Sequence, residues 1–282
     1  MPNNEVVKKS DITILVNSCD YYEDAWNPFF RLLKIQWPKC EDYDIVLNTE
    51  NKTFDCDYLN IRTFCGGNEK TWSKRLLDCL ETIDSEYVFF FLEDEFLYEP
   101  VNVSEFEKAM IFLNDNKDVG VLYPHKNKKQ IIDIDEDYFS RDLITETRRL
   151  VCICAIWRKS FLVKMISEEE SPWDFETYAP ERSKKYSERI LQYNKSLPGM
   201  IFYDDQVDFG YGITEKKWLP KTKELFDKYE IEVNYDNLGF YPYENQIIAQ
   251  KERRKQRKRE QKVELNPIEI LYNIKKKLKG RK

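Results

Sequence analysis

The strongest constraint on the fold is a run of six apolar residues, Tyr87-Val88-Phe89-Phe90-Phe91-Leu92, which ends at three successive acids, Glu93-Asp94-Glu95. Six residues suit a strand better than a helix, and the run has no polar side. A strand that is apolar on both sides belongs in the centre of a sheet that helices cover on both faces. We therefore expect an α/β fold in which a mixed sheet is flanked by helices.

The segments around this run alternate between strand and helix patterns. Residues 11–19 form a β-branched run typical of a strand, and the apolar spacing over 26–37 predicts an amphipathic helix with Pro28 near its first turn. The same patterns predict strands at 43–47, 59–64, 119–123 and 150–157, and helices at 72–83, 104–113 and 160–166. We expect no domain boundary before residue 250.

Two helix starts carry capping signals. Ser104 and Glu107 have the spacing of a capping box. Ser171 is followed by Pro172, which predicts an N-cap and a first helical residue.

Composition limits the class of protein. The chain has 282 residues, of which 41% are hydrophobic and 15% aromatic, so it can bury a large core in one domain of catalytic size. A disordered, fibrous or repeat architecture is excluded. No apolar run approaches the roughly 20 residues that cross a bilayer, and the polar first ten residues do not resemble a secretory signal. We expect a cytoplasmic protein.

The cysteine and histidine content excludes several kinds of site. Seven scattered cysteines are typical of reduced core thiols, and strand alternation would place Cys152 and Cys154 on one face without the partners of a zinc site. The single histidine is His125, so a Ser-His-Asp or Cys-His mechanism would have to use that residue. Hydrolase chemistry of that kind is not expected.

The charge is concentrated at the C-terminal end. Residues 251–282 hold 14 Lys and Arg against 4 Asp and Glu, whereas residues 1–250 have a net charge of −16. Pro267 and the apolar residues that follow it predict a basic amphipathic helix. The segment suits an anionic membrane surface, with nucleic acid the less favoured partner, and a simple solvated helix is the alternative.

The acids that follow the apolar run lie where a ligand is expected. In an open α/β sheet, ligands bind beyond the carboxyl ends of the strands. Glu93, Asp94 and Glu95 would repel one another there, and Mg²⁺ or Mn²⁺ would relieve that repulsion. A solvated acidic turn is the alternative interpretation.

Several motifs together resemble one enzyme family. They are Val16-Asn17-Ser18-Cys19-Asp20, Leu47-Asn48-Thr49-Glu50, Trp72-Ser73-Lys74-Arg75-Leu76, Phe91-Leu92-Glu93-Asp94 and Pro172-Trp173-Asp174-Phe175-Glu176. With the order of strands and helices, they are similar to bacterial GT-A-like glycosyltransferases of capsule or lipopolysaccharide assembly, which have a Rossmann-like fold. In that family an Asp-X-Asp motif after the fourth strand holds a metal on the donor diphosphate. Here the motif is Glu-Asp-Glu, which leaves open which acid meets a metal and whether one is needed.

The resemblance implies roles for residues on the donor side. Asp94 and Glu95 are the candidates for the metal, and Glu93 would support them or contact the ribose. The residues implied for the nucleobase and ribose are Asn17, Ser18 and Asp20. Simple turn chemistry is the alternative for Asn17 and Ser18.

The donor phosphates have candidates of their own. Lys74 and Arg75 at a helix start could contact them, although Lys74 could equally be an exposed lysine. Lys216 and Lys217 could close over the leaving diphosphate.

An inverting transferase also needs a carboxylate that removes the proton of the acceptor hydroxyl. Glu176 is the candidate base and Asp174 its substitute, held between aromatic residues that could stack on a sugar ring. A capping box with Ser171 is the alternative role for Asp174, and a favourable helix-dipole position is the alternative for Glu176.

The sequence thus predicts a GT-A-like catalytic domain over 1–249 and a basic helical tail over 250–282. The donor-binding half is expected at about 11–125 and the acceptor half at about 126–249. The predicted function is inverting transfer of a sugar from a nucleoside-diphosphate-sugar donor to a glycan or lipid-linked glycan acceptor, with the tail at the inner face of the cytoplasmic membrane. Two alternatives are a sugar-1-phosphate nucleotidyltransferase and a non-enzymatic membrane- or nucleic-acid-binding adaptor.

Overall fold

The computed structural model describes residues 8–124, 150–193, 198–202 and 211–242. Within them, seven strands form one mixed sheet in the order β3-β2-β1-β4-β6-β5-β7. The strands are β1 (Ile12–Asn17), β2 (Asp44–Thr49), β3 (Arg62–Cys65), β4 (Tyr87–Leu92), β5 (Val119–Tyr123), β6 (Ala155–Arg158) and β7 (Arg189–Gln192). The first four are parallel to one another, and β6 runs antiparallel between β4 and β5.

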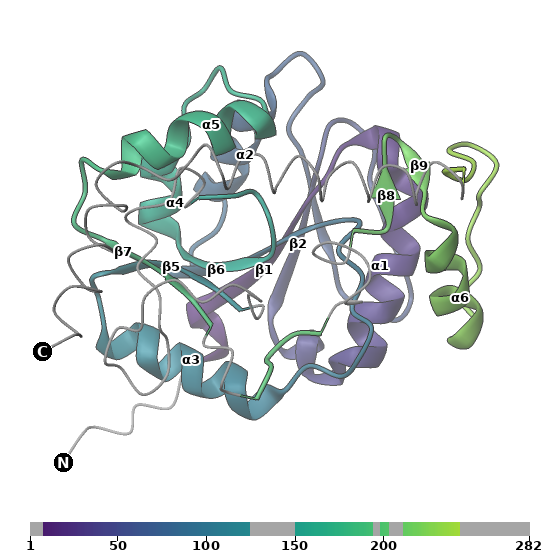
Figure 1. The fold of residues 1–282 in the computed structure, drawn as a ribbon, viewed down its shortest axis with the longest axis horizontal. Coiled ribbons are helices and arrows are strands. Elements are labelled where there is room, and N and C mark those ends of the chain that lie inside the picture. Colours follow the sequence, from purple (N-terminus) through teal and green to yellow (C-terminus); the bar gives the residue numbers. More distant parts are fainter. Residues whose placement is uncertain (1–7, 125–149, 194–197, 203–210, 243–282) are drawn as a thin grey trace, which may run out of the picture.

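Helices cover both faces of the sheet (Figure 1). One face is covered by α1 (Glu23–Gln36) and α3 (Val103–Asp115), and the other by α2 (Trp72–Glu81), α4 (Lys159–Met165) and α5 (Pro172–Ser183). A two-stranded hairpin of β8 (Ile213–Thr214) and β9 (Lys217–Trp218) leads into α6 (Pro220–Lys228) beside α1. Three short 3-10 helices are η1 (Lys9–Asp11), η2 (Asp20–Tyr22) and η3 (Pro38–Asp42).

Strand β4 lies in the middle of the core, as its sequence predicts. Tyr87, Phe89 and Phe91 face the layer of α1 and α3, whereas Val88 and Phe90 face the layer of α2, α4 and α5. All five are buried. Each such side chain contributes about 1.5–3 kcal/mol through burial, so this strand holds the two layers together. The predicted α/β class with a mixed sheet is confirmed.

The structure corrects two of the predicted helix starts. Helix α3 begins after Asn102, whose side chain accepts a hydrogen bond from the Glu105 backbone N–H, so Ser104 lies inside the helix. Asn is as good an N-cap as Ser, and the helix cap lies two residues earlier than the Ser104 spacing suggests. Helix α1 begins at Glu23, which places Pro28 in its second turn.

The predicted strand over 150–157 is also wrong in its first half. Only Ala155–Arg158 pairs in the sheet, because the backbone N–H groups of Cys152 and Cys154 donate to carboxylates instead of to a neighbouring strand. The two cysteines consequently do not share a face: Cys154 belongs to the α1 and α3 side of the core, and Cys152 to the opposite side. All seven cysteines are free.

One predicted helix start is confirmed, and two other predictions concern residues that the structure does not describe. The N-cap at Ser171 with Pro172 as first helical residue is confirmed. His125 and the tail at 250–282 lie outside the described residues. Among the helices that are described, we find no segment with the length and apolar character of a membrane span.

Candidate active site

The carboxyl ends of β1, β2 and β4 meet at one edge of the sheet because the three strands are parallel. Asn17 ends β1 and is paired with Asn48 on β2, whose Nδ2 donates to Asn17 Oδ1 over 2.7 Å. Both side chains are buried. The Oδ1 atom of Asn48 has no hydrogen-bond partner among the described residues. An unpaired buried acceptor costs about 1–3 kcal/mol, so this edge retains capacity for a ligand that donates a hydrogen bond.

Ser18 follows Asn17 and is held by α1. Trp26 Nε1 donates to Ser18 Oγ over 2.7 Å, and the Ser18 backbone N–H donates to the Asn48 carbonyl. The Ser18 hydroxyl also contacts Glu93. Ser18 therefore joins β1 to the acids at the end of β4.

The three acids after β4 are buried and do not face water. Glu93, Asp94 and Glu95 are 6%, 9% and 1% exposed. Burial is the largest cause of the shift in each of them: it raises the pKa of Asp94 to about 7 and that of Glu95 to about 8. Burial, with the neighbouring charge of Asp94, also raises the pKa of Glu93 well above its ordinary value. Carboxyl groups with such raised pKa values are typical of functional sites.

Both oxygens of Glu95 are occupied. Oε2 accepts the Leu92 backbone N–H over 2.8 Å, and Oε1 accepts the Cys154 backbone N–H over 2.9 Å. A backbone bridge to Tyr211 also pairs Glu95 with the segment that leads to β8. In this structure Glu95 ties three segments together at the end of β4.

The neighbouring Asp94 is bound to the same segment. The Gly212 backbone N–H donates to the Asp94 carbonyl over 2.7 Å, and the Ile213 N–H lowers the pKa of the Asp94 carboxyl, which partly offsets the effect of burial. A Cβ atom on Gly212 would lie 2.1 Å from the Phe96 ring, so only glycine allows this close approach.

The structure brings Glu176 to the same acids. It lies in the second turn of α5, and its Oε1 accepts the Cys152 backbone N–H over 3.0 Å. Among the described residues, no hydrogen bond reaches its Oε2. Burial, and then the charges of Glu176, Glu95 and Glu93, raise the pKa of the Cys152 thiol, so all three carboxylates act on the same thiol.

Asp174 has a different position. Its Oδ2 accepts the Ser171 hydroxyl over 2.6 Å and the Ser171 backbone N–H over 3.0 Å, which forms the capping box at the start of α5. These hydrogen bonds hold the pKa of Asp174 below its usual value. The structure thus gives Asp174 the helix-capping contact and gives Glu176 a contact with the backbone of Cys152, two residues before the Cys154 N–H that binds Glu95.

Asp20 organises the loop after β2. Its carboxylate accepts the backbone N–H groups of Glu50, Asn51 and Lys52, each at 3.1 Å, and its own N–H donates to Glu50. Asp20 therefore fixes the backbone next to the Asn17 and Asn48 pair.

Arg75 lies beside this loop. It is buried and pairs with Glu50 at 3.4 Å, and its Nε atom has no partner within the described segments. Its stem passes over Gly66, where a Cβ atom would come within 2.9 Å of it. Arg75 Nε on α2 and Asn48 Oδ1 on β2 are thus a buried donor and a buried acceptor without partners among the described residues.

The three predicted lysines lie at the surface. Lys74 pairs with Asp78 at 3.0 Å and with Glu168 at 3.5 Å, so its charge is already compensated. Lys216 lies over the Tyr21 ring with Nζ 4.9 Å from the centroid, which brings the β8–β9 hairpin to the end of β1. Lys217 is exposed on β9.

The hairpin turn itself is strained. Glu215 and Lys216 both have positive φ values, 49° and 63°, in a turn where Gly or Asn is usual.

The segment 150–154 lies beside the site, although its sequence predicts only a strand. Its two N–H groups, those of Cys152 and Cys154, hold Glu176 and Glu95. A strand pattern masks this role, because an apolar run is the same in sequence whether its N–H groups bond to a strand or to carboxylates. In the sequence Asn48 is only one residue of the motif Leu47-Asn48-Thr49-Glu50. The structure alone shows that its Oδ1 atom has no partner among the described residues.

The contacts of the acids limit how they could bind a metal. Within the described ranges, no three acidic, cysteine or histidine side chains come together as a cation site. Glu95 spends both oxygens on backbone N–H groups. Mg²⁺ commonly takes only one or two carboxylates and completes its shell with phosphate and water, so the carboxylates of Glu93 and Asp94 fit that smaller role.

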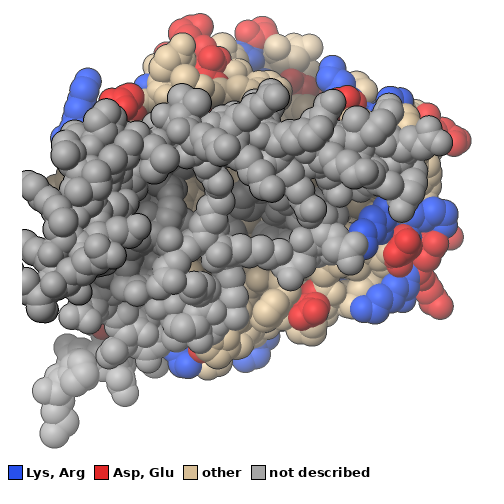
Figure 2. All heavy atoms as spheres, viewed as in Figure 1, with Lys and Arg blue, Asp and Glu red and all other residues tan. Residues whose placement is uncertain are grey.

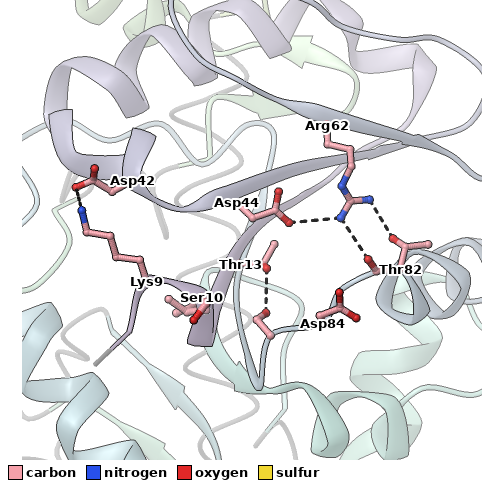
Figure 3. Close-up of a pocket in the computed structure, with 10 residues that line it drawn as sticks. Lys9, Ser10, Thr13, Asp42, Asp44, Arg62, Thr82 and Asp84 are labelled. Atoms are coloured by element: carbon pink, nitrogen blue, oxygen red, sulfur yellow. Dashed lines mark hydrogen bonds and ion pairs between the residues drawn. The ribbon is translucent and has the colours of Figure 1, made fainter. Parts of the chain in front are cut away.

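A cavity of about 550 Å³ lies at the opposite edge of the sheet. Figure 3 shows it at the amino ends of the parallel strands, where Lys9 pairs with Asp42 and Arg62 pairs with Asp44. Ligands of open α/β sheets bind at the carboxyl ends, and the charges here are paired with one another. We place the candidate active site at the other edge.

The strand order and the parallel pairing define an α/β protein with a Rossmann-like sheet. Among solved structures, the chain is similar to Staphylococcus aureus TarS 1–349, with 16% identity and a TM-score of 0.44 over 67% of this chain and 59% of that chain. The structure of TarS 1–349 in complex with UDP-GlcNAc gives 14% identity and a TM-score of 0.45, over 67% and 57%. A cytidylyltransferase from Leptospira borgpetersenii gives 14% identity and a TM-score of 0.41, over 67% and 77%.

These likenesses concern the fold alone. The chain spans 59% of TarS 1–349 and 36% of the longer TarS chain. No protein-family model matches the sequence, and the curated proteins contain no match either.

Proposed function

We propose that the protein is a glycosyltransferase that moves a sugar from a nucleoside-diphosphate-sugar donor to a glycan acceptor of a bacterial surface polysaccharide, capsule or lipopolysaccharide. The observation that carries the proposal is the cluster of Glu93, Asp94 and Glu95 at the end of the central strand, joined there by Glu176 from α5. Burying acids is costly, so a cluster of them at the ligand-binding edge of the sheet supports a catalytic use.

The donor nucleoside would lie at the ends of β1 and β2. Asn48 Oδ1 is an unused acceptor on β2 and Arg75 Nε an unused donor on α2, and polar groups of a nucleoside could bond to either of them. Asn17, Ser18 and Asp20 shape the backbone around them.

In the proposed reaction, Glu176 Oε2 accepts the proton of the acceptor hydroxyl. The hydroxyl oxygen forms the new bond to C1 of the sugar from the side opposite the leaving group. The bond between C1 and the phosphate oxygen breaks, and the nucleoside diphosphate leaves with that electron pair. A single displacement of this kind inverts the configuration at C1.

The charge that develops on the leaving diphosphate needs a counter-charge. Lys216, held at the end of β1 by its contact with Tyr21, and Lys217 next to it are the proposed cations. Mg²⁺ or Mn²⁺, held by Asp94 with Glu93 beside it, would supply Lewis-acid stabilisation of the diphosphate when bound. Glu95 keeps the role of positioning the strand end.

The basic tail enters the proposal as a membrane contact. We propose that residues 251–282 hold the enzyme at the inner, cytoplasmic face of the membrane, near a lipid-linked acceptor. Figure 2 shows one face of the molecule. Where the described residues are visible on it, Lys and Arg side chains lie among Asp and Glu side chains and form no separate basic stripe.

A nucleotidyltransferase is the weaker alternative. That chemistry would need a glycine-rich, basic loop after the first strand. Here Ser18 leads through Cys19 directly into the short helix η2, and the Asp20 carboxylate already binds the backbone of the next loop.

The donor can be tested by thermal shift with UDP-, GDP-, dTDP- and CMP-sugars, with and without Mn²⁺. A donor at 100 times its Kd stabilises the folded protein by about 2.7 kcal/mol. Asp94→Asn should fold normally, because burial already favours the neutral form, and should lose sugar transfer. Asp55→Asn, at an exposed aspartate, is the control. Wild-type turnover in Asp94→Asn would reject the assignment.

The base can be tested in the same assay. Glu176→Gln should lose turnover by 100-fold or more, whereas Asp174→Asn should keep it. The opposite result would reverse the assignment. Deleting residues 251–282 should leave transfer in solution intact, whereas an adaptor would lose its only function.

A further inference from the structure

Trp173 is the most exposed large apolar side chain in the described part of the chain, at 77%, ahead of Tyr178 at 56% and Tyr21 at 49%. One exposed apolar side chain is ordinary on a protein surface. What distinguishes Trp173 is its place in the first turn of α5, one turn before the proposed base Glu176.

The turn that carries Trp173 is held rigidly. Pro172 is the first helical residue, and the capping box of Ser171 and Asp174 closes the helix start. Thr177 Oγ1 donates to the Trp173 carbonyl over 2.8 Å. A rigid backbone under an exposed ring lowers the entropy lost when a ligand binds to it.

The core fixes the same turn from below. Phe175 is buried and packs edge-on against Trp72, with ring centroids 5.9 Å apart, and against Trp157. Phe175 therefore anchors α5 while Trp173 projects away from the core.

Trp173 and Glu176 are close enough to serve one ligand. Side chains three residues apart on a helix have Cβ atoms about 5–6 Å apart. Glu176 is fixed by the Cys152 backbone through Oε1, which leaves Oε2 for a second partner. A ring stacked on the indole would present its hydroxyl groups to that oxygen.

The charge around Trp173 argues against a lipid surface. Glu168 and Glu169 are exposed just before α5, and Asp174 follows Trp173 directly. Acidic side chains are repelled by anionic lipid headgroups. A sugar ring is neutral, has one apolar C–H face that packs on an aromatic ring, and has hydroxyl groups that bond to carboxylates.

We propose that Trp173 is the acceptor platform: the apolar face of a pyranose ring of the glycan acceptor stacks on its indole, with a hydroxyl group directed at Glu176. This inference rests on the proposed function and adds the place of the acceptor to it.

The test uses an array of bacterial surface oligosaccharides as the probe, followed by titration of the bound oligosaccharide in solution. The full-length wild-type chain should bind a member of the array. Trp173→Ala should weaken that binding about 30-fold, as for a central aromatic anchor, and Trp173→Phe should restore most of it. Tyr178→Ala, at the next exposed aromatic residue of α5, is the matched control and should bind like the wild type.

Three results would overturn the inference. The first is equal oligosaccharide binding by Trp173→Ala and wild type, and the second is no oligosaccharide binding by the wild type. The third is that, when both proteins are also assayed with phosphatidylglycerol vesicles, Trp173→Ala loses binding to the vesicles and not to the oligosaccharide. Donor binding by thermal shift separates this test from that of the proposed function. If a nucleotide-sugar binds and oligosaccharide binding ignores Trp173, only the acceptor platform fails. If no nucleotide-sugar binds, the transferase proposal fails whatever Trp173 does.

Discussion

Replacing Glu95 by Gln tests whether the acids at the end of β4 are held neutral inside the protein. The Glu95 carboxyl group is 1% exposed and accepts the backbone N–H groups of Leu92 and Cys154. Burial raises its pKa from an ordinary 4.5 to about 8. Gln has nearly the same shape and cannot ionise.

The sign of the effect follows from proton binding. Between pH 4.5 and 8 the folded protein keeps a proton on Glu95 that the unfolded chain has released. The free energy of unfolding therefore falls as pH rises, by up to about 1.4 kcal/mol per pH unit, or about 4 kcal/mol between pH 5 and 8. Above pH 8 this contribution is lost in full.

The variant lacks this dependence. At pH 5 it should be about 1–2 kcal/mol less stable than the wild type, because one backbone N–H loses its acceptor. At pH 8 it should be the more stable protein by about 2 kcal/mol, since it carries no buried carboxyl to ionise. Glu93 and Asp94 still titrate in both proteins, and because the charge of Glu95 also raises the pKa of Glu93, the difference between the proteins includes this coupling.

Urea unfolding at pH 5, 6.5 and 8, followed by tryptophan fluorescence, measures these values. Glu81→Gln, at an exposed glutamate of α2, is the control and should follow the wild type at each pH. The reasoning is refuted if Glu95→Gln and wild type lose stability in parallel between pH 5 and 8.

Three further substitutions test the supports of the site by thermal or urea unfolding. Asp174→Ala removes the capping box of α5 and should cost about 1 kcal/mol; no loss would contradict that role. Gly212→Ala should cost about 1–3 kcal/mol because its Cβ would lie 2.1 Å from Phe96, and an unchanged midpoint would show that the segment moves freely. Glu215→Gly should stabilise the hairpin by about 1 kcal/mol, because glycine adopts a positive φ without steric cost. A lower unfolding midpoint would contradict the strain.

The parts of the fold that depend on neighbours in sequence could be predicted. The central strand follows from six apolar residues at Tyr87–Leu92, and the start of α5 follows from Ser171 and Pro172. Asn102 was missed as a cap because Ser104 offers an equally good local signal, and only the path of the chain into α3 selects between them.

The site could be predicted in part. Ligands of open α/β sheets bind at the carboxyl ends of the strands, so the sequence predicts a site at Glu93, Asp94 and Glu95, and the structure places these residues directly after β4. The sequence does not predict that these acids are buried. Nor does it predict that Glu95 accepts the Cys154 N–H, because Cys154 lies 59 residues away in the chain.

By itself, the amino-acid sequence determined the order of the strands and helices and most of their positions, because apolar periodicity and helix caps act over a few residues. Only the tertiary structure decided that Glu176 accepts the backbone N–H of Cys152 while Asp174, two residues before it, caps its own helix. The physical reason is that a carboxylate takes its role from the donors that surround it. For Glu176 the donor is the backbone of a segment 24 residues away in the chain, which folding alone brings within 3.0 Å.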